Sequence, residues 1–455
     1  MTTTTKPAAQ AIPHPPKRVP ILGDVLGMDR KRPNQKTLWQ FGQLGPLYRR
    51  TFIGGTHLTF AGSAELMREI TDEKTWQRHF GRPYEKLREI GNDGLFTAGN
   101  DTAEWKRGHE ALIGGFVPAA MQGYHDTMLS VANLTAGWLG EGRTVTDTAA
   151  MMGDTALEVI ARAGFGHEVG AFEDRTAGRA PFADALTRVF SYAQESAIPV
   201  LGALTGGKRA HQHAADIELM KHTVIDVIET RRRTGARCPD LLDRMLHPEN
   251  GTPLPDDNIA DQVLTLFIAG HETTGNLLAF VAHFLARDPE LAARVRAEAA
   301  AVSTDGRIAY EDVAKLKVTD AVISETLRLW PIAPGFFRAA RQDTTLGGYD
   351  ISAGEWVFVL LLAVHRDTSV WGADAEEFRP DRWLEDGFRP KPWMYRPFGT
   401  GPRSCIGQAF ALHEAKLIIA SMVRDFELAG SGELDVEENL TLRPSNLEIE
   451  FRRLK

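Results

Sequence analysis

A run of about 30 residues from Asp256 to Arg287 constrains the possible folds of this chain more than any other feature. The run begins with two carboxylates, which suit the first turn of a helix, and it then carries apolar residues such as Ile259, Phe267 and Leu278 on several sides. At 1.5 Å per residue, a helix of this length spans roughly 45 Å, enough to cross a large domain. We therefore expect a long helix at the centre of the molecule, buried on most sides.

The rest of the pattern indicates a mainly α fold with small β-sheets. Residues from about 64 to 296 carry helical periodicity that is interrupted at Pro and Gly clusters. Runs prone to β structure flank Gly54-Gly55, residues 344–364 alternate in the manner of short strands, and residues 440–451 indicate a closing hairpin. The composition at the start, rich in Thr, Ala and Pro, predicts a flexible N-terminal arm over residues 1–20 and a single domain over residues 21–455.

Composition excludes several classes of protein. The 52 basic residues are outnumbered by 60 acidic ones, which gives a net charge of −8 and no global positive field for nucleic acid or an anionic membrane. Two cysteines, Cys238 and Cys405, cannot build the disulfide framework of a small secreted domain. The sequence also shows no export signal and no apolar run of about 18 residues. We therefore expect a cytoplasmic protein without a membrane anchor.

The segment around Cys405 has the composition of a loop that presents a thiolate. Residues 397–407 combine three glycines, Arg403 and one thiol just before a helical pattern. Glycines permit tight turns, and the backbone donors at the start of the following helix would lower the thiol pKa. A thiolate in such a loop is a candidate iron ligand. A lone cysteine is more commonly a small buried hydrophobe, but the flanking glycines and Arg403 favour the metal-ligating role.

Two other motifs fit different functions less well. Gly202–Lys208 is one residue short of a phosphate-binding loop, and Arg209 replaces the hydroxyl that would hold magnesium. His271-Glu272 begins like a zinc-protease helix, but Gly275 occupies the position of the second histidine. A nucleotide binder is therefore a distant alternative, and a zinc protease lacks its site.

At the cysteine loop the chain resembles the cytochrome P450 family, whose haem loop has the pattern Phe-Gly-x-Gly-x-Arg-x-Cys-x-Gly. Three further family motifs occur in the expected order, at residues 269–274, 325–328 and 378–383, so the resemblance covers nearly the whole chain. Within the family the chain is similar to the haem domain of bacterial fused fatty-acid hydroxylases, through residues 94–97, 105–109 and 409–415. Every fixed position of the haem-loop pattern is matched, at Phe398, Gly399, Gly401, Arg403, Cys405 and Gly407.

The resemblance implies a P450 fold in which the long central helix lies over haem b and Cys405 is the axial iron ligand. Residues 21–455 would then form a haem-thiolate monooxygenase domain. Glu325, Arg328 and Arg382 match a buried ion network that supports the haem loop in the family. The other positions that the resemblance places at the cofactor are the propionate contacts Arg403, Trp105, His109 and Arg338 and the loop positions Phe398, Gly399 and Gly407.

An acid and an alcohol stand side by side in the middle of the predicted central helix. The Thr273 hydroxyl can bond back to a carbonyl, and Gly270 can weaken regular helical bonding, which predicts a kinked helix that holds water. In the P450 family the pair that Glu272 and Thr273 match relays protons during O2 activation. Relatives that use peroxide usually lack this pair, so its presence favours O2 and externally supplied electrons.

We therefore expect a haem-thiolate monooxygenase that inserts one O2-derived oxygen atom into an apolar organic substrate, by hydroxylation or epoxidation. The substrate is expected to be a natural-product scaffold or a fatty-acid-like molecule. A haem-binding sensor or carrier without turnover is the alternative, and the Glu272-Thr273 pair argues against it. The residues expected to face the substrate are Phe96, Ala269, Ala333, Pro334 and Leu440.

The resemblance also bears on how a fatty acid would bind. In the fused hydroxylases an Arg and a Tyr at the channel mouth anchor the substrate carboxylate. This chain has Gly55 and Thr59 at the corresponding hairpin positions. Since a bidentate Arg clamp is stronger than a neutral hydrogen bond, we expect long-chain fatty acids to bind weakly.

Electrons are expected to come from another protein. The sequence contains no recognisable flavin domain and no Gly-x-Gly-x-x-Gly dinucleotide motif. A separate ferredoxin or flavodoxin with its reductase is therefore the expected partner. The basic residues expected to form its docking face are Lys106, Arg107, Lys391, Arg396 and Arg403.

Overall fold

The computed structural model of the protein describes residues 11–16, 18–24, 27–85, 87–172, 180–196, 207–248 and 253–455. The chain forms two compact units, each assembled from segments that are distant in sequence. Unit 1 takes residues 1–80, 327–379 and 387–405, and unit 2 takes residues 81–326, 380–386 and 406–455. Residues 202–206 of the segment that resembles a phosphate-binding loop lie outside the described residues.

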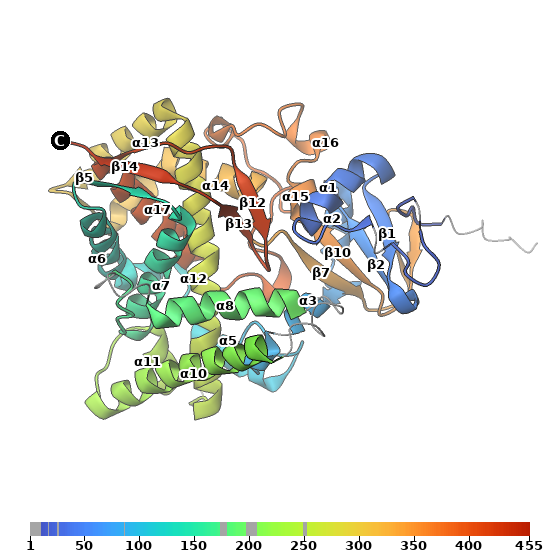
Figure 1. The fold of residues 1–455 in the computed structure, drawn as a ribbon, viewed down its shortest axis with the longest axis horizontal. Coiled ribbons are helices and arrows are strands. Elements are labelled where there is room, and N and C mark those ends of the chain that lie inside the picture. Colours follow the sequence, from blue (N-terminus) through green and yellow to red (C-terminus); the bar gives the residue numbers. More distant parts are fainter. Residues whose placement is uncertain are drawn as a thin grey trace, which may run out of the picture. The chain divides into compact units, whose positions relative to one another are not determined.

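Unit 1 is built on a five-stranded sheet in the order β1–β2–β10–β7–β3 (Figure 1). Neighbouring strands are antiparallel except β2 and β10, which are parallel. Gly54 and Gly55 turn the chain between β1 and β2 with φ of 78° and 77°, so the predicted hairpin is confirmed. The strands of unit 1 are β1 Leu47–Thr51, β2 His57–Ala61, β3 Trp76–Arg78, β7 Gly335–Ala340, β8 Thr344–Leu346, β9 Tyr349–Ile351 and β10 Trp356–Leu360.

The core of unit 1 forms where short helices meet this sheet. Buried side chains of the sheet pack with Met67 of α2 and Val364 of α15. Ile12 packs against the same core, and the Arg49 backbone N–H donates to the Pro13 carbonyl at 2.8 Å. The contacts of unit 1 therefore begin before residue 20, the expected end of the N-terminal arm. The helices of unit 1 are α1 Pro33–Leu44, α2 Ala64–Ile70, α15 Leu361–Val364 and α16 Thr368–Trp371.

Unit 2 is mainly helical and contains the predicted long helix. α12 runs over 32 residues from Asp256 to Arg287 and is largely buried, so both its bounds and its burial confirm the prediction. α7 packs along α12, and α8 packs along α10 (Figure 1). The other helices, of which α14 ends in unit 1, are α3 Arg82–Glu85, α4 Arg88–Gly91, α5 Ala103–Ile113, α6 Met121–Leu139, α7 Thr148–Phe165, α8 Pro181–Ser196, α10 Lys208–Thr234, α11 Leu241–Leu246, α13 Pro289–Val302, α14 Lys317–Leu329 and α17 Gln408–Asp425.

Glycines let α7 and α12 approach each other closely. A Cβ on Gly275 would lie 2.5 Å from the Gly153 Cα, closer than carbon atoms can pack. Gly270 faces Ile160 of α7, where an added Cβ would lie 3.1 Å from the nearest side-chain carbon. α12 runs through Gly270 without a break, and the kink expected there stays a prediction. Gly270 also makes room for Ile160.

The strands of unit 2 correct one expectation. Residues 440–451 do not form a single closing hairpin, because β13 pairs with β12 whereas β14 lies between β11 and β4. Between β13 and β14, the Leu447 carbonyl accepts a hydrogen bond from the Thr148 N–H at 2.9 Å, which ties this segment to α7. The strands are β4 Gly142–Val145, β5 Ser303–Thr304, β6 Arg307–Ile308, β11 Phe426–Ala429, β12 Asp435–Glu438, β13 Leu442–Ser445 and β14 Ile449–Arg453.

The element content confirms the predicted class, mainly α with small β-sheets. Among the described residues, none of the helices combines the length and the apolar character that crossing a membrane requires. The expectation that residues 21–455 act as one domain stays a prediction.

Candidate functional site

Cys405 ends a loop of unit 1 that glycines shape. Its backbone N–H donates to the Phe398 carbonyl at 2.8 Å, and its side chain is exposed. Gly399 and Gly401 have φ of 76° and 70°, a region that residues with a Cβ disfavour. Arg403 is half-buried in the short helical turn η7 (Gly401–Arg403). The exposure of the thiol removes the alternative that Cys405 is a core cysteine.

Arg338 on β7 is a buried arginine with one donor unused. Its Nη2 donates to the Trp76 carbonyl at 3.0 Å and lies 3.0 Å from Glu73 Oε1. Its Nε has no hydrogen-bond partner in the part of the chain that the structure describes. Burial lowers the pKa of Arg338, and the Glu73 carboxylate opposes this change. A buried guanidinium with an unused N–H is suited to bind an anionic group.

The two substrate candidates of unit 1 directly precede β7. Ala333 is exposed, so its side chain is open to a ligand. Pro334 is buried, and its carbonyl accepts a hydrogen bond from the Leu361 N–H at 2.8 Å. Pro334 therefore also fixes the position of α15 against the sheet.

α5 of unit 2 carries the two ring side chains predicted at the haem propionates. Thr102 caps the helix, because its hydroxyl accepts a hydrogen bond from the Trp105 N–H at 3.3 Å. Trp105 and His109 lie one turn apart, both half-buried, with ring centroids 5.0 Å apart. A Cβ on Gly108 would lie 2.7 Å from Gln262 Nε2, so this glycine allows α5 to lie close to α12.

The middle of α12 is accessible although the helix is buried on both sides of it. Ala269 is exposed and Glu272 and Thr273 are half-buried, whereas residues 262–267 and 274–283 are buried. The Thr273 hydroxyl donates to the Ala269 carbonyl at 2.6 Å, which confirms the expected back-bond. The acid and the alcohol therefore lie on an open stretch of an otherwise buried helix.

Glu272 is held by the segment that joins β12 to β13. Its Oε1 accepts a hydrogen bond from the Thr441 hydroxyl at 2.7 Å, while Oε2 is buried without a partner among the described residues. Burial of the carboxyl raises the pKa of Glu272, and the Thr441 bond opposes this more weakly. The carboxyl is therefore shifted towards its protonated form, the form that a proton donor needs.

The loop that carries Phe96 is fixed on α12. The Leu95 N–H donates to Gln262 Oε1 at 2.9 Å. Gly94 lies against Thr265, where an added Cβ would be 2.0 Å from Oγ1. Phe96 itself is 42% exposed. This substrate candidate therefore lies beside the part of α12 that precedes the acid and the alcohol.

Leu440 completes the substrate candidates of unit 2. It is nearly buried and directly precedes Thr441, the residue bonded to Glu272. Phe96, Ala269 and Leu440 therefore all come from elements that meet α12. Gly407, the last haem-loop position, is the residue that precedes α17.

The predicted ion network is buried. In unit 2, Arg382 Nε donates to Glu325 Oε1 at 3.1 Å and Trp383 Nε1 donates to Oε2 at 2.8 Å. In unit 1, Arg328 is fully buried. Its guanidinium donates to three carbonyls, at distances of 2.9, 2.6 and 2.8 Å, which belong to His365, Ala375 and Glu377. The pairing of Glu325 with Arg328 stays a prediction.

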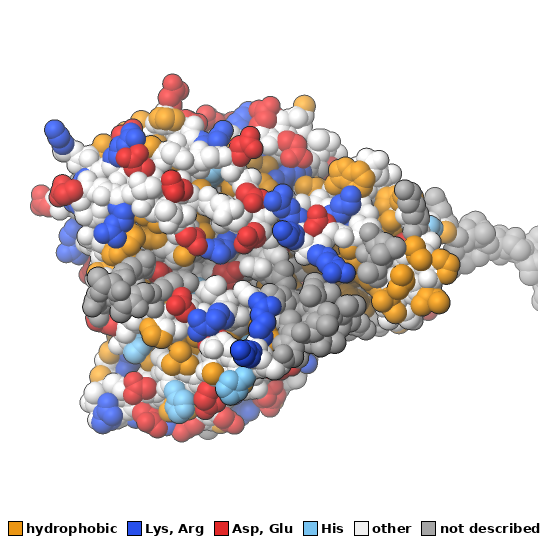
Figure 2. Space-filling model, in the orientation of Figure 1, with side chains coloured by type: hydrophobic (Ala, Val, Ile, Leu, Met, Phe, Trp, Pro, Cys, Tyr) orange, Lys and Arg blue, Asp and Glu red, His pale blue; other side chains and the backbone are white. Residues whose placement is uncertain are grey.

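The basic residues proposed for partner docking lie in both units. Lys106 and Arg107 are exposed on α5, and Arg107 lies 3.7 Å from Glu104. Lys391 is exposed in unit 1, and Arg396 is half-buried there. Figure 2 shows basic and acidic side chains interspersed on the face drawn, in line with 52 basic and 60 acidic residues in the chain. A common basic face stays a prediction.

Comparison with known proteins decides the family. A family model for cytochrome P450 matches residues 13–451. The chain belongs to the cytochrome P450 family. The bifunctional cytochrome P450/NADPH–P450 reductase 2 of Bacillus subtilis is 36% identical over 98% of this chain, and a bifunctional cytochrome P450/NADPH–P450 reductase of Bacillus cereus is 36% identical over 96%. A self-sufficient cytochrome P450 monooxygenase of Exserohilum turcicum is 32% identical over 97%.

The P450 described here spans 43% of the length of the first of these relatives and 42% of the other two. Family membership assigns the cofactor, haem b bound through a cysteine thiolate, and the class of enzyme, oxidoreductases that incorporate one atom of O2. The residues fit this cofactor. Cys405 offers an exposed thiol, Arg338 offers an unused buried donor suited to a propionate, and Ala269 marks an accessible stretch of α12.

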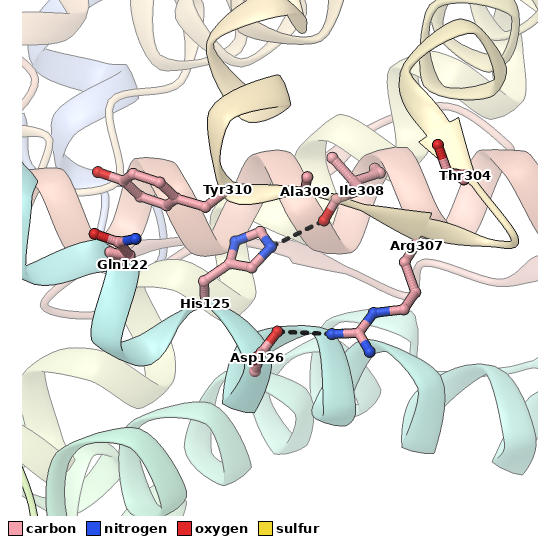
Figure 3. Close-up of a pocket in the computed structure, with 8 residues that line it drawn as sticks. All are labelled: Gln122, His125, Asp126, Thr304, Arg307, Ile308, Ala309 and Tyr310. Carbon is pink, nitrogen blue, oxygen red and sulfur yellow. Dashed lines mark hydrogen bonds and ion pairs between the residues drawn. The ribbon is translucent and has the colours of Figure 1, made fainter.

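A cavity of about 320 Å³ lies elsewhere in unit 2 of this P450, between α6 and the β5–β6 hairpin (Figure 3). His125 Nε2 lies 2.9 Å from the Ile308 carbonyl and must carry the proton there, so its Nδ1 accepts from His413 Nε2 at 3.1 Å. Arg307 at the rim donates to Asp126 at 2.8 Å. The residues that line this cavity include no haem, proton-relay or substrate candidate.

Sequence reasoning missed three residues that shape the candidate site of this P450. They are Thr441, which bonds Glu272, Asn276, whose Nδ2 donates to Thr441 Oγ1 at 3.2 Å, and Gln262, which holds the Phe96 loop. Gln262 had a signal, because a lone amide on an apolar helix face needs a polar partner. Thr441 had a signal too, because it directly follows Leu440, which was predicted to face the substrate. Asn276 had none, since its partner is distant in the sequence.

Proposed function

We propose that this P450 is a monooxygenase that inserts one O2-derived oxygen atom into an apolar organic molecule, most often by hydroxylating carbon. The observation that carries the proposal is the pair on α12. Glu272 and Thr273 lie on the accessible stretch of the helix, and burial shifts the Glu272 carboxyl towards its protonated form. When bound, haem b supplies the redox chemistry that cleaves O2.

The residues of this chain have separate tasks in the proposed reaction. Cys405 holds the iron as a thiolate, and the positive φ of Gly399 and Gly401 sets the path of its loop. Thr273 orders a water molecule beside α12. Glu272 passes a proton from Oε2 to that water and regains one from solvent. The remaining groups, which would bind the haem propionates, are Arg338, Arg403, Trp105 and His109.

Two spectroscopic and kinetic measurements test the proposal. The reduced protein with carbon monoxide should give the absorption band of a thiolate-ligated haem, and Cys405→Ala should lose it. Under O2 and a chemical or protein reductant, substrate should be consumed with incorporation of one labelled oxygen atom from 18O2. Thr273→Ala should retain the carbon monoxide band but release more peroxide. A haem protein that binds ligands yet never consumes reductant with any substrate would establish the sensor alternative.

The substrate is proposed to be uncharged and apolar. Support comes from the β1–β2 hairpin, where Thr59 is buried and hydrogen-bonded to Arg49, and where Arg49 and His57 both lie against Glu355. Arg49 of this hairpin is thus already paired with a protein carboxylate, and Arg50 is buried and donates to Gln40 Oε1. Long-chain fatty acids and their methyl esters should therefore bind with similar affinity in spectral titrations. A large preference for the free acid would show a carboxylate clamp elsewhere in the protein.

Electrons are proposed to come from a separate ferredoxin or flavodoxin with its reductase. The exposed cations Lys106 and Arg107 on α5 support an acidic partner. Charge reversal at both positions should slow electron transfer and reduce its dependence on ionic strength. The names of the Bacillus relatives describe a reductase as part of the same protein. A cytoplasmic location, expected from the cysteine count, stays a prediction.

A further inference from the structure

Thr441 contacts the proposed proton donor from a part of the chain that is remote in sequence. Its hydroxyl donates to Glu272 Oε1 at 2.7 Å. Thr441 is only 8% exposed, so water competes little for this bond. The Asn439 N–H donates to the Thr441 carbonyl at 2.9 Å, which holds the backbone of the segment in place. The position of the hydroxyl is therefore fixed by the fold of the β12–β13 hairpin.

Asn276 fixes the direction of the Thr441 hydrogen bond. The Asn276 Nδ2 lies 3.2 Å from Thr441 Oγ1, and an amide nitrogen can only donate. The Thr441 hydroxyl therefore accepts from Asn276 and points its own proton at Glu272. Asn276 is buried one turn after Glu272 on α12, so the helix and the hairpin together define one orientation of the acid.

The two oxygens of Glu272 differ as a result. Oε1 accepts the Thr441 proton, whereas Oε2 is buried and has no partner among the described residues. In a protonated carboxyl the oxygen that already accepts a hydrogen bond serves as the carbonyl, so the acidic proton resides on the other oxygen. Oε2 is thus the oxygen that carries the transferable proton.

We propose that Thr441 is a positioning residue for Glu272: its hydroxyl fixes Oε1, so that Oε2 presents the proton in a single orientation. The inference rests on the proposed function, because it assigns the acid of that reaction. Thr441 bonds Oε1 and not Oε2, the oxygen that carries the transferable proton. Its effect is exerted through the orientation of the Glu272 carboxyl.

Three variants separate this role from a structural one. Thr441→Val keeps the shape of the side chain and removes the hydroxyl, whereas Thr441→Ser keeps the hydroxyl. Ser445→Ala is the matched control, because Ser445 lies on the same hairpin and its buried hydroxyl has no partner among the described residues. Thr441→Ala provides a smaller side chain where valine prevents folding. The carbon monoxide band reports whether each variant folds and holds haem.

The first readout is independent of turnover. At a pH low enough to protonate Glu272, the infrared carbonyl stretch of its carboxyl, assigned through its loss in Glu272→Gln, should move to higher frequency in Thr441→Val, because Oε1 loses its hydrogen bond. Thr441→Ser and Ser445→Ala should keep the wild-type frequency. An unchanged band in Thr441→Val and Thr441→Ala would overturn the proposal.

The second readout is the partition of reducing equivalents between product and peroxide. Thr441→Val should lower the product share about five- to tenfold, less than the loss expected when an acid is removed outright, and Thr441→Ser should restore it. A shifted band with unchanged partition would overturn the proposal, because the contact would then be structural only. If the wild-type protein oxidises no substrate, the proposed function fails, and the infrared band alone decides whether Thr441 orients Glu272.

Discussion

Arg328 and Arg338 are both buried arginines of unit 1, but their donors are used differently. Arg328 donates to three backbone carbonyls at 2.6 to 2.9 Å. Arg338 donates to one carbonyl and lies against the Glu73 carboxylate, while its Nε has no partner among the described residues. An unsatisfied buried donor destabilises a fold unless a ligand completes its bonding. The difference therefore predicts that Arg328 serves the fold and that Arg338 serves a bound group.

The strongest test of this comparison removes the satisfied arginine. Arg328→Met should lower the free energy of unfolding by about 3–5 kcal/mol, because three carbonyls, two of them in buried hydrogen bonds, lose their donor. Urea denaturation followed by circular dichroism measures the loss. Arg341→Met is the control, since Arg341 is exposed and its side chain donates to the Glu73 carbonyl at 3.0 Å. Equal losses in the two variants would contradict the structural role of Arg328.

A pH titration extends the test to a neighbour of Arg328. His365 Nε2 accepts from the Arg396 N–H at 3.1 Å, so its Nδ1 carries the proton that bonds the Arg328 carbonyl. Burial lowers the pKa of His365 to about 3, and the cations Arg328 and Arg366 add to the effect. The unfolded chain binds this proton below about pH 6.5, so stability present above pH 6.5 is lost as the pH falls towards 3.

The expected loss from His365 is on the order of 5 kcal/mol over this range of pH. The free energy of unfolding, measured between pH 7 and the lowest pH at which the protein stays folded, should fall accordingly. The His365 ring signals in nuclear magnetic resonance spectra should show no titration above about pH 5. A titration midpoint at the ordinary histidine pKa would show that the ring is not held between Arg328 and Arg396.

Removing the unsatisfied arginine should have a different signature. Arg338→Leu should change the unfolding transition little, because a buried charge with incomplete bonding contributes little net stability. Haem release to an acceptor protein should accelerate by about 30-fold, the equivalent of roughly 2 kcal/mol of lost charge-assisted bonding. Arg338→Lys keeps the charge without the planar fork and should give an intermediate rate. Unchanged haem release would refute the propionate contact.

The smallest effect is expected at the carboxylate that competes for Arg338. Glu73 is partly exposed, with 38% of its side chain accessible, so its ion pair with Arg338 is weak. Glu73→Gln should leave stability unchanged and slow haem release by at most about threefold. The same haem-transfer assay measures this change. Faster haem release in Glu73→Gln would mean that the carboxylate holds Arg338 in place for its ligand.

Local sequence patterns correctly predicted the helices and strands that are determined by residues close together in the sequence. The bounds of α12 followed from its acidic start and apolar faces, and the β1–β2 hairpin followed from Gly54-Gly55. The expected hairpin over residues 440–451 was wrong, because strand partners are chosen by sheets that assemble from distant segments. The packing of Gly270 against Ile160 was not predicted for a similar reason, because Ile160 belongs to another helix.

The residues of the candidate site also fall into two groups, those that local motifs predicted and those that they did not. Cys405, Glu272 and Thr273 were found from motifs, since their chemistry is carried by adjacent residues. The bond from Thr441 to Glu272 and the unused Nε of Arg338 depend on residues that are distant in the sequence and meet only in the folded protein. Such contacts follow from packing, not from spacing along the chain. The positions at haem and substrate named from the sequence stay predictions until a bound structure tests them.

Gly153 of α7 and Gly275 of α12 are distant in the sequence, but they lie against each other where the two helices pack. Gly275 cannot gain a methyl group while α7 and α12 keep their separation, because the added carbon would lie 2.5 Å from the Gly153 Cα. A substitution at Gly275 therefore requires the two helices to move apart. Mutant libraries that aim to alter substrate choice should keep both glycines. They should vary the predicted substrate residues Phe96, Ala269 and Leu440.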